Sequence, residues 1–242
     1  MEWRDSGILL TSRRHGESAA IIEVFTQDHG RHAGVVQGGG ARRMAPVLQP
    51  GAQLSLNWRA RLEDHLGTFS VEPIQSRAAG LMADSLTLAA FGTIAALLSQ
   101  GLPEREAHPL LYDQTIALAN SLALGGDWLA DYVGWEMLLL RELGYGLDLN
   151  QCAVTAQRND LAYVSPRSGR AVSRAAAGAW ADKLLPLPDI MLGGVVASPE
   201  NVVQALTTTG YFLENRAFPA LGRARLPAAR DRLIAALQRR FK

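Results

Sequence analysis

Short apolar segments separated by turn residues fill the first 77 positions of the chain. Runs rich in β-branched and aromatic side chains, bounded by glycine- and aspartate-containing turns, are typical of strands. They predict five strands, at 8–13, 19–26, 31–37, 52–60 and 67–74. Alternation in the fourth strand places Leu54, Leu56 and Trp58 on one face, so we expect Trp58 in the core. Five short strands favour a small barrel or sandwich.

After Pro73 the apolar pattern takes the period of a helix. It predicts helices at 81–99, 109–124 and 128–143, with others beginning at Ser198-Pro199 and Pro227. We expect Asp127 to cap the third helix and Gly144 to end it. The apolar face of the last helix comprises Leu233, Ile234, Leu237 and Phe241.

The two patterns together predict an α+β chain. A β-barrel domain is expected over residues 1–78, followed by a mostly α-helical domain over 79–242 in which 145–180 is an irregular loop region. Phe25 faces away from Ile22 and Val24 on its strand. It lies either on the exposed surface of the barrel or under the helices.

Composition is that of a folded protein with room for one large domain or two modest ones, at 242 residues and 48% apolar content. Residues 1–5 are charged and lead into no cleavable apolar segment, so no secretory signal is expected. The longest apolar stretch, 81–98, is interrupted by Asp84 and predicts a core helix, not a membrane span. The single cysteine, Cys152, excludes an internal disulfide and fits the reducing cytoplasm.

Charge is unevenly distributed behind the net value of +1. Residues 78–150 carry two arginines against nine acids, whereas residues 151–242 carry 13 basic residues against six acids. Such segregation is typical of polyanion-binding proteins, but it also arises by chance. Arginine outnumbers lysine by 22 to 2, which fits a compositional bias of the genome.

No catalytic, cofactor or small-molecule motif is found. The glycines at 38–40 are followed by no Gly-Lys-Ser/Thr, so they do not form a P-loop. His29 and His32 have ligand-like spacing without a third ligand, so we expect surface or turn histidines. Glu63-Asp64 is expected in a solvated loop, and Cys152 has no activating partner, which favours a buried or inert thiol. The sequence therefore predicts no enzyme, no metal site and no cofactor.

The stretch from Gly30 to Leu62 contains five arginines and no acid. Its glycine loop, 38–50, could bring backbone N–H groups close to phosphate while Arg42 and Arg43 add charge-assisted hydrogen bonds. A solvated loop with scattered surface arginines explains the same composition. The segment 216–242, with eight basic residues and one acid, leaves three alternatives open: a second polyanion surface, a site for an acidic peptide, or a solvated helix face.

Several short motifs resemble, in order and spacing, the RecO family of bacterial DNA repair proteins. These motifs are Trp-Arg-Asp-Ser-Gly-Ile-Leu-Leu at 3–10, Arg-His-Gly-Glu at 14–17, Thr-Gln-Asp-His-Gly-Arg-His-Ala-Gly at 26–34, Val-Gln-Gly-Gly at 36–39, Leu-Gln-Pro-Gly at 48–51, Leu-Gly-Tyr-Gly-Leu-Asp-Leu at 143–149 and Asp-Leu-Ala-Tyr-Val-Ser-Pro-Arg-Ser-Gly at 160–169. The resemblance runs along the whole chain and implies a recombination mediator.

The resemblance implies an N-terminal OB-fold and a helical C-terminal domain. It also implies binding of single- and double-stranded DNA, annealing of complementary strands, and cooperation with RecR and the single-stranded-DNA-binding protein SSB to load RecA. The place of action would be the cytoplasm, at the nucleoid. OB barrels commonly bind single strands across strands two and three and the nearby loops.

The sequence departs from the family at the zinc site that many members carry. The four positions of its two Cys-x-x-Cys pairs correspond here to Cys152, Thr155, Ser173 and Ala176. Because one ligand of four remains, we predict no zinc, and we expect packing through Tyr163 and Trp180 to hold this region instead.

These considerations lead to one predicted DNA surface. It comprises Arg13, Arg31, Arg42, Arg43, Arg59 and Arg61. Two alternatives remain: an interaction adaptor whose helical domain binds the acidic C-terminal peptide of SSB, with DNA contact secondary, and an OB protein that binds RNA.

Overall fold

The computed structural model describes residues 1–62, 64–194 and 198–241. The chain divides into two compact units, Met1–Gly126 and Asp127–Lys242, each of which is described by itself. Among the described residues, no helix is both long and apolar enough to cross a membrane.

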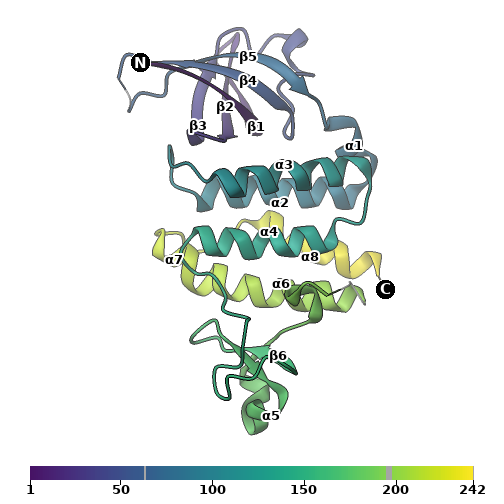
Figure 1. Ribbon diagram of the computed structural model, residues 1–242. Coiled ribbons are helices and arrows are strands. Elements are labelled where there is room, and N and C mark those ends of the chain that lie inside the picture. The colour runs from purple at the N-terminus through teal and green to yellow at the C-terminus, as the bar shows by residue number, and fades with distance from the viewer. Residues whose placement is uncertain (63, 195–197, 242) are drawn as a thin grey trace. The chain divides into compact units, whose positions relative to one another are not determined.

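The first unit begins with a closed five-stranded barrel (Figure 1). Its strands are β1 (Glu2–His15), β2 (Ala19–Thr26), β3 (Gly30–Val36), β4 (Gln53–Arg59) and β5 (Thr68–Gln75). The order β1-β2-β3-β5-β4, with β3 and β5 parallel, is that of an OB-fold and confirms the predicted fold class. β1 is longer than predicted because its first half pairs with β4 and its second half with β2.

The barrel core confirms the alternation seen in the fourth strand. Leu54, Leu56 and Trp58 are at most 1% exposed, and they pack with Ile22 and Val24 of β2. The Trp58 indole N–H donates to the Leu66 carbonyl at 3.1 Å, so the one polar atom of this ring is satisfied.

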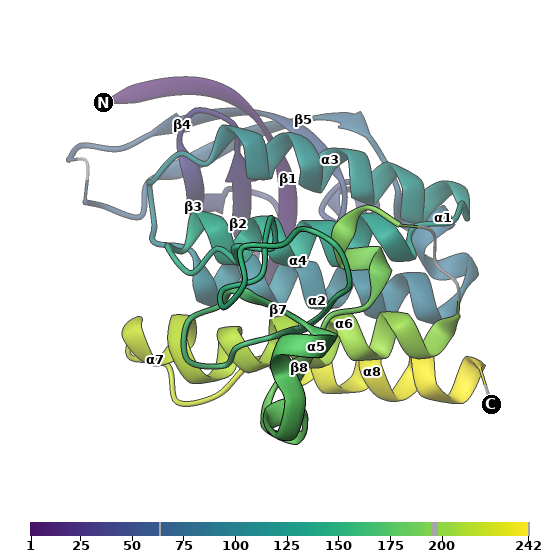
Figure 2. The same ribbon diagram turned by 60° about the horizontal axis from the view of Figure 1, so that its bottom comes forward.

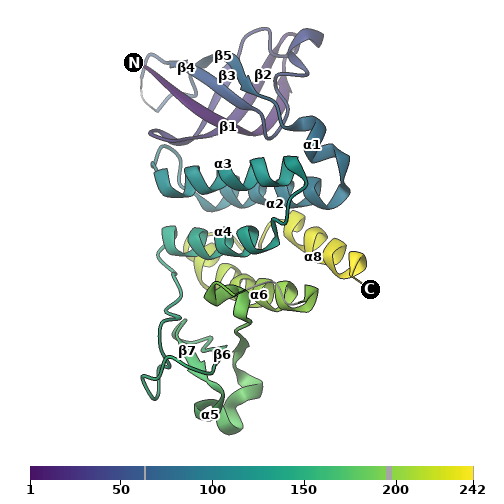
Figure 3. The ribbon, with the colours of Figure 1, turned by 45° about the vertical axis from the view of Figure 1, so that its right-hand side comes forward.

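Helices pack against β1 and the second half of β2 within this unit (Figure 3). They are α1 (Ala78–Ala83), α2 (Ser85–Gly101) and α3 (Pro109–Leu124). Phe25 is fully buried against Tyr112 of α3, with ring centroids 5.7 Å apart, and Ser99 of α2 donates to Glu23. This contact places Phe25 under the helices, one of the two positions left open by the sequence. Part of the barrel face that OB-folds commonly use for ligands, around Glu23, Phe25 and Arg31, is therefore an internal contact here.

A single helix over 81–99 was the wrong prediction, since the backbone at Asp84 is extended and separates α1 from α2. The Asp84 carboxylate accepts a hydrogen bond from the Leu86 N–H at 3.1 Å and so caps α2. Arg77, just before α1, is 2% exposed and donates to the Gly51 carbonyl and to Asn120 of α3. Its burial lowers the pKa of the guanidinium.

Two glycines with left-handed backbone offer a matched stability test. Gly30 has φ +62°, and a Cβ there would lie 1.9 Å from the Glu106 carbonyl oxygen, whereas Gly16 has φ +60° and open space around it. Both substitutions by alanine carry the same left-handed strain, so the difference reports the clash. We expect Gly30→Ala to destabilise the protein by about 2 kcal/mol more than Gly16→Ala in urea unfolding. Equal midpoints would contradict the close contact.

The second unit combines helices with a small sheet (Figure 2). Its helices are α4 (Leu129–Glu142), α5 (Arg174–Ala177), α6 (Pro199–Phe212), α7 (Phe218–Ala220) and α8 (Ala228–Arg240). The strands β6 (Leu161–Val164), β7 (Ala171–Ser173) and β8 (Leu185–Pro186) pair in the order β7-β6-β8. The described residues also form the 3-10 segments η1 (Arg42–Met44), η2 (Gly178–Lys183) and η3 (Asp189–Leu192), and a π-helical turn, η4 (Leu213–Ala217).

The predicted starts of α6 and α8 agree with the structure, but α8 ends at Arg240, so Phe241, 40% exposed, does not belong to its apolar face as expected. A further difference lies at the start of α4. Its first turn begins after Trp128 with no side-chain cap, so the predicted cap at Asp127 is wrong. Gly144 follows the helix with φ +84°, and α6 begins at Pro199 directly after Ser198, both as predicted. The region predicted to be irregular contains β6, β7 and α5, whose three or four residues each are too short to produce a periodic pattern.

A buried ion pair links α4 and α8. The Arg230 guanidinium, 4% exposed, makes two bonds of 2.9 Å to the fully buried Glu136 carboxylate. Tyr132 and Thr209 also donate to this carboxylate. Burial alone would lower the pKa of Arg230, but Glu136 more than offsets it, so the pKa is raised. Arg230 is therefore not available to solvent, to a polyanion or to an acidic peptide, which corrects all three alternatives for the segment 216–242 at this position.

Candidate nucleic-acid interface

The structure separates the six predicted arginines along the barrel. β1 begins opposite Arg59 of β4 and ends at the hairpin with β2, where Arg13 pairs with Ile21. From Glu2 to Arg13 the strand advances by 11 residue steps, roughly 36 Å along the chain. Figure 1 shows the N-terminus and the β4–β5 loop at one side of the barrel and η1 at the other. The predicted surface is therefore not one continuous track.

Arg13, Arg14, Arg42 and Arg43, which we call the hairpin–loop surface, gather where the β1–β2 hairpin meets the glycine loop. The Gly40 N–H donates to the Ser18 carbonyl at 2.8 Å, and Arg14 donates to the Gly40 carbonyl at 3.4 Å. All four side chains are exposed, and within the described part of the chain none pairs with a carboxylate. Arg14 was missing from the sequence prediction, although its neighbour Arg13 was included.

The glycine loop has a defined conformation. A Cβ on Gly40 would lie 3.1 Å from the Ser18 carbonyl group, so the close approach to the hairpin suits glycine. The backbone then enters η1, in which Met44 N–H donates to Ala41 at 2.9 Å, and Leu48 beyond it is buried in the barrel core. Arg42 and Arg43 are consequently held on a structured turn, in a fixed place beside the hairpin.

Arg31 lies on β3, away from the hairpin–loop surface, and its guanidinium already has protein partners. Its side chain is 11% exposed, pairs with Glu23, and donates from Nε to the Leu102 carbonyl at 3.0 Å. Glu104 lies 3.4 Å from the same guanidinium. Because these contacts join β3 to the segment after α2, Arg31 holds the helices on the barrel and is not available to a phosphate.

Arg59 and Arg61 lie at the opposite end of the barrel from the hairpin–loop surface. Arg59 pairs with Glu2 at 2.8 Å, and the pKa of that carboxyl is lowered by the hydrogen bond from Arg59 and by one from Asn57. A polar hollow of about 270 Å³ beside them is lined by residues that include Arg4 and Glu72. Acidic side chains here partly neutralise the arginines, so this end is less suited to a phosphate backbone.

An aromatic cluster, not foreseen from the sequence, occupies the same end. Trp3 stacks on His29 with ring centroids 4.1 Å apart, and its ring centroid lies 5.7 Å from that of Trp58. His32 is 3% exposed, which corrects the expected surface position, and His29 pairs with Asp5 at 3.0 Å. Burial, aided by Arg105 and His29, lowers the pKa of His32 to about 4. On β3, His32 lies two residues from both Gly30 and Gly34 and therefore on the same face of the strand. This two-residue spacing was the signal that could have revealed its inward position.

The positions that resemble a zinc site do not fit a zinc ion. Cys152, 1% exposed, accepts hydrogen bonds from the Ser173 N–H at 3.3 Å and hydroxyl at 3.5 Å, and Ser173 accepts from Ala176 N–H. Burial raises the pKa of the thiol, but the bonds from Ser173 and Thr155 more than offset this and lower it to about 6. Thr155, Ser173 and Ala176 supply no soft donor, so hydrogen bonds and packing with Tyr163 hold this region. Trp180 is 64% exposed and does not contribute as expected.

Comparison with known proteins identifies relatives over the full length. The models "Recombination protein O N terminal" and "Recombination protein O C terminal" match residues 1–77 and 82–224. Proteins named DNA repair protein RecO from Roseobacter denitrificans and Dinoroseobacter shibae are 58% and 56% identical over 242 and 239 residues, covering 100% and 99% of both chains. One from Cereibacter sphaeroides is 59% identical over 239 residues, 99% of both chains. The chain therefore belongs to the RecO family of DNA repair proteins.

Proposed function

We propose that this protein is a recombination mediator that binds DNA through the hairpin–loop surface and catalyses no reaction. The observation that carries the proposal is the group of four exposed arginines, without carboxylate partners among the described residues, on a structured turn. A guanidinium binds phosphate oxygens through two parallel N–H donors, so such a group suits a phosphate backbone. The glycine loop that carries Arg42 and Arg43 lies in a stretch without acids, and Glu17 in the hairpin turn is the acid nearest in sequence to Arg13 and Arg14, so the surface keeps a positive net charge.

Contacts with the phosphate backbone of DNA also support binding of both single and double strands and annealing of complementary strands. Because the bases are not read, single- and double-stranded DNA both bind, and the pairing edges of a single strand stay free for annealing to its complement. Part of the usual OB face is already occupied, since Glu23 and Phe25 of β2 contact the helices and Arg31 of β3 contacts the segment after α2. With RecR, the protein would help load RecA onto DNA coated by SSB, whose acidic C-terminal peptide is a further partner. This role places it in the cytoplasm, at the nucleoid.

The variant Arg42→Ala/Arg43→Ala tests the surface. Loss of two phosphate contacts is expected to make the log–log salt slope shallower by about 1.4, which corresponds to roughly 25-fold weaker binding at 0.1 M salt. Fluorescence anisotropy of a labelled oligothymidylate over a salt series measures both quantities. Arg59→Ala/Arg61→Ala removes the same charge at the other end of the barrel and should weaken binding far less. Equal losses in the two variants, or none, would refute this assignment, and a tighter affinity for RNA would favour an RNA-binding role.

A further inference from the structure

The second unit contains a pocket of about 270 Å³ that none of the described functions uses. It lies where segment 144–146 meets segment 167–169, beside the end of α6 and the π-helical turn η4. Just beyond the first segment, the Asp148 N–H donates to the Gly169 carbonyl at 3.0 Å and the Ala171 N–H donates to the Asp148 carbonyl at 2.9 Å, which holds the two stretches of chain together. Its lining residues are Gly144, Tyr145, Gly146, Arg167, Ser168, Gly169, Phe212 and Arg216.

The charges of this pocket suit an anion. Arg167 and Arg216 are exposed, and in the described ranges neither forms an ion pair; Arg216 donates only to the Pro166 carbonyl, at 3.5 Å. No acidic residue lines the pocket, and the nearby Asp148 is paired with Arg170 at 3.3 Å. Arg216 lies on the π-helical turn, a geometry that is frequent at functional sites because it redirects side chains.

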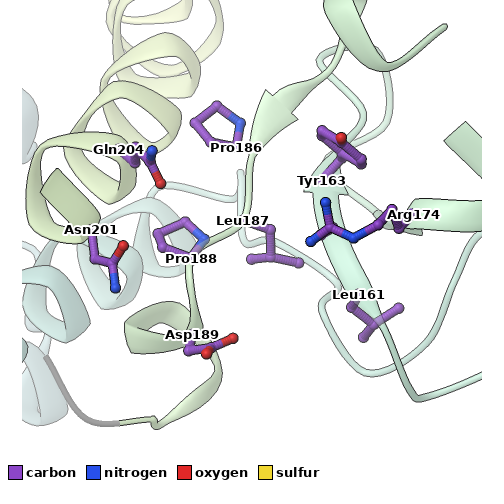
Figure 4. Close-up of a pocket in the computed structure, with 10 residues that line it drawn as sticks. Leu161, Tyr163, Arg174, Pro186, Leu187, Pro188, Asp189, Asn201 and Gln204 are labelled. Atoms are coloured by element: carbon purple, nitrogen blue, oxygen red, sulfur yellow. The ribbon is translucent and has the colours of Figure 1, made fainter. Parts of the chain in front are cut away.

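A larger hollow in the same unit, of about 350 Å³, provides a contrast (Figure 4). Arg174 lines it, but Asp189 does too, and Arg174 already pairs with Asp160 at 3.5 Å. That hollow has no net positive lining to attract a phosphate. The pocket with Arg167 and Arg216 differs from it in having two arginines and no carboxylate.

The apolar part of the pocket suits a nucleobase. The Tyr145 ring is half-buried, and Phe212, 4% exposed, lies behind Gly169. Bases stack on such rings without regard to sequence, and arginines beside the ring bind the flanking phosphates. A volume at the small end of ligand pockets suits one nucleotide of a longer strand.

We infer that this pocket is a second single-stranded DNA site, in which Arg167 and Arg216 bind phosphates and Tyr145 stacks on one base. The inference rests on the proposed function, since it takes the same ligand. An acidic peptide, whose carboxylates also pair with arginine, is the competing occupant and is an outcome of the test.

The first experiment compares two charge-matched variants. Arg167→Ala/Arg216→Ala should weaken oligothymidylate binding by about 25-fold at 0.1 M salt and make the salt slope shallower by about 1.4. Arg158→Ala/Arg174→Ala, which removes two exposed arginines of the same unit outside the pocket, should leave binding within about twofold. Thermal melts establish that both variants are folded. Equal affinities for the two variants overturn the inference.

The second experiment locates the base. Irradiation of the full chain with an oligonucleotide that contains 4-thiothymidine should give an adduct at Tyr145, which mass spectrometry of peptides identifies. Tyr145→Phe should keep an adduct there and Tyr145→Leu should lose it. If wild-type protein binds no DNA, the proposed function itself fails. If DNA binds through Arg42 and Arg43 but gives no adduct at Tyr145, or if an acidic peptide alone requires Arg167 and Arg216, only the inference about this pocket fails.

Discussion

Replacing Glu136 by alanine is expected to destabilise the second unit by about 3–5 kcal/mol. The change leaves the Arg230 guanidinium buried without its carboxylate, and an uncompensated buried charge is costly. Tyr132 and Thr209 lose their hydrogen bonds to this carboxylate in the same step. Urea unfolding followed by far-ultraviolet circular dichroism measures the loss as a lower midpoint.

Two further variants separate the charge from the packing. Glu136→Leu/Arg230→Met removes both ions and should recover most of the stability, since a buried pair and an apolar replacement of similar volume are nearly equivalent. Asp231→Ala, on the exposed side of the same helix, should change stability by less than about 0.5 kcal/mol. A double variant as unstable as Glu136→Ala would show that lost packing, and not the unpaired charge, dominates.

Acidification is expected to destabilise the first unit through His32. In the unfolded chain this histidine takes up a proton near pH 6.5, but in the folded barrel its pKa is lowered to about 4. The stability that the neutral ring contributes is therefore complete above pH 6.5 and is lost as the pH falls from 6.5 to 4. The full difference amounts to about 3 kcal/mol.

His32→Phe isolates this contribution. Phenylalanine suits the aromatic surroundings of Trp3, Trp58 and Phe69 and cannot be protonated. The difference in unfolding free energy between this variant and wild type should grow in the variant's favour between pH 6.5 and 4. His15→Gln, on the exposed hairpin, should retain the wild-type pH dependence. Parallel curves for His32→Phe and wild type would contradict a buried neutral His32.

The periodicity of apolar residues predicted most strands and helices because it shows which face of each element is buried. The alternation of Leu54, Leu56 and Trp58 gave both a strand and its inward side. The break at Asp84 was missed because apolar residues continue on both sides of it, and only the backbone shows that the aspartate caps a new helix. The strands β6, β7 and β8 were missed because two to four residues carry no readable period.

The candidate site was predicted only in part because charge in a sequence does not reveal its partner. Arg42 and Arg43 are exposed as expected, but Arg31 and Arg230 are held by carboxylates 8 and 94 positions away. Nothing local distinguishes these two classes of arginine. Pairing at such separations is set by the tertiary fold, which composition cannot report.

The contacts between the barrel and the helices that follow it have a consequence for dividing the protein into fragments. The N-terminal family model ends at residue 77, but the compact unit extends to Gly126. A fragment that ends with the barrel would expose Phe25, and Arg77 would lose its hydrogen bond to Asn120. The exposed apolar surface beside the strands would favour non-specific binding and aggregation. An oligonucleotide bound to such a fragment would report on the surface exposed by the truncation and not on the native surface. The smallest piece in which the barrel keeps its own surroundings is therefore residues 1–126.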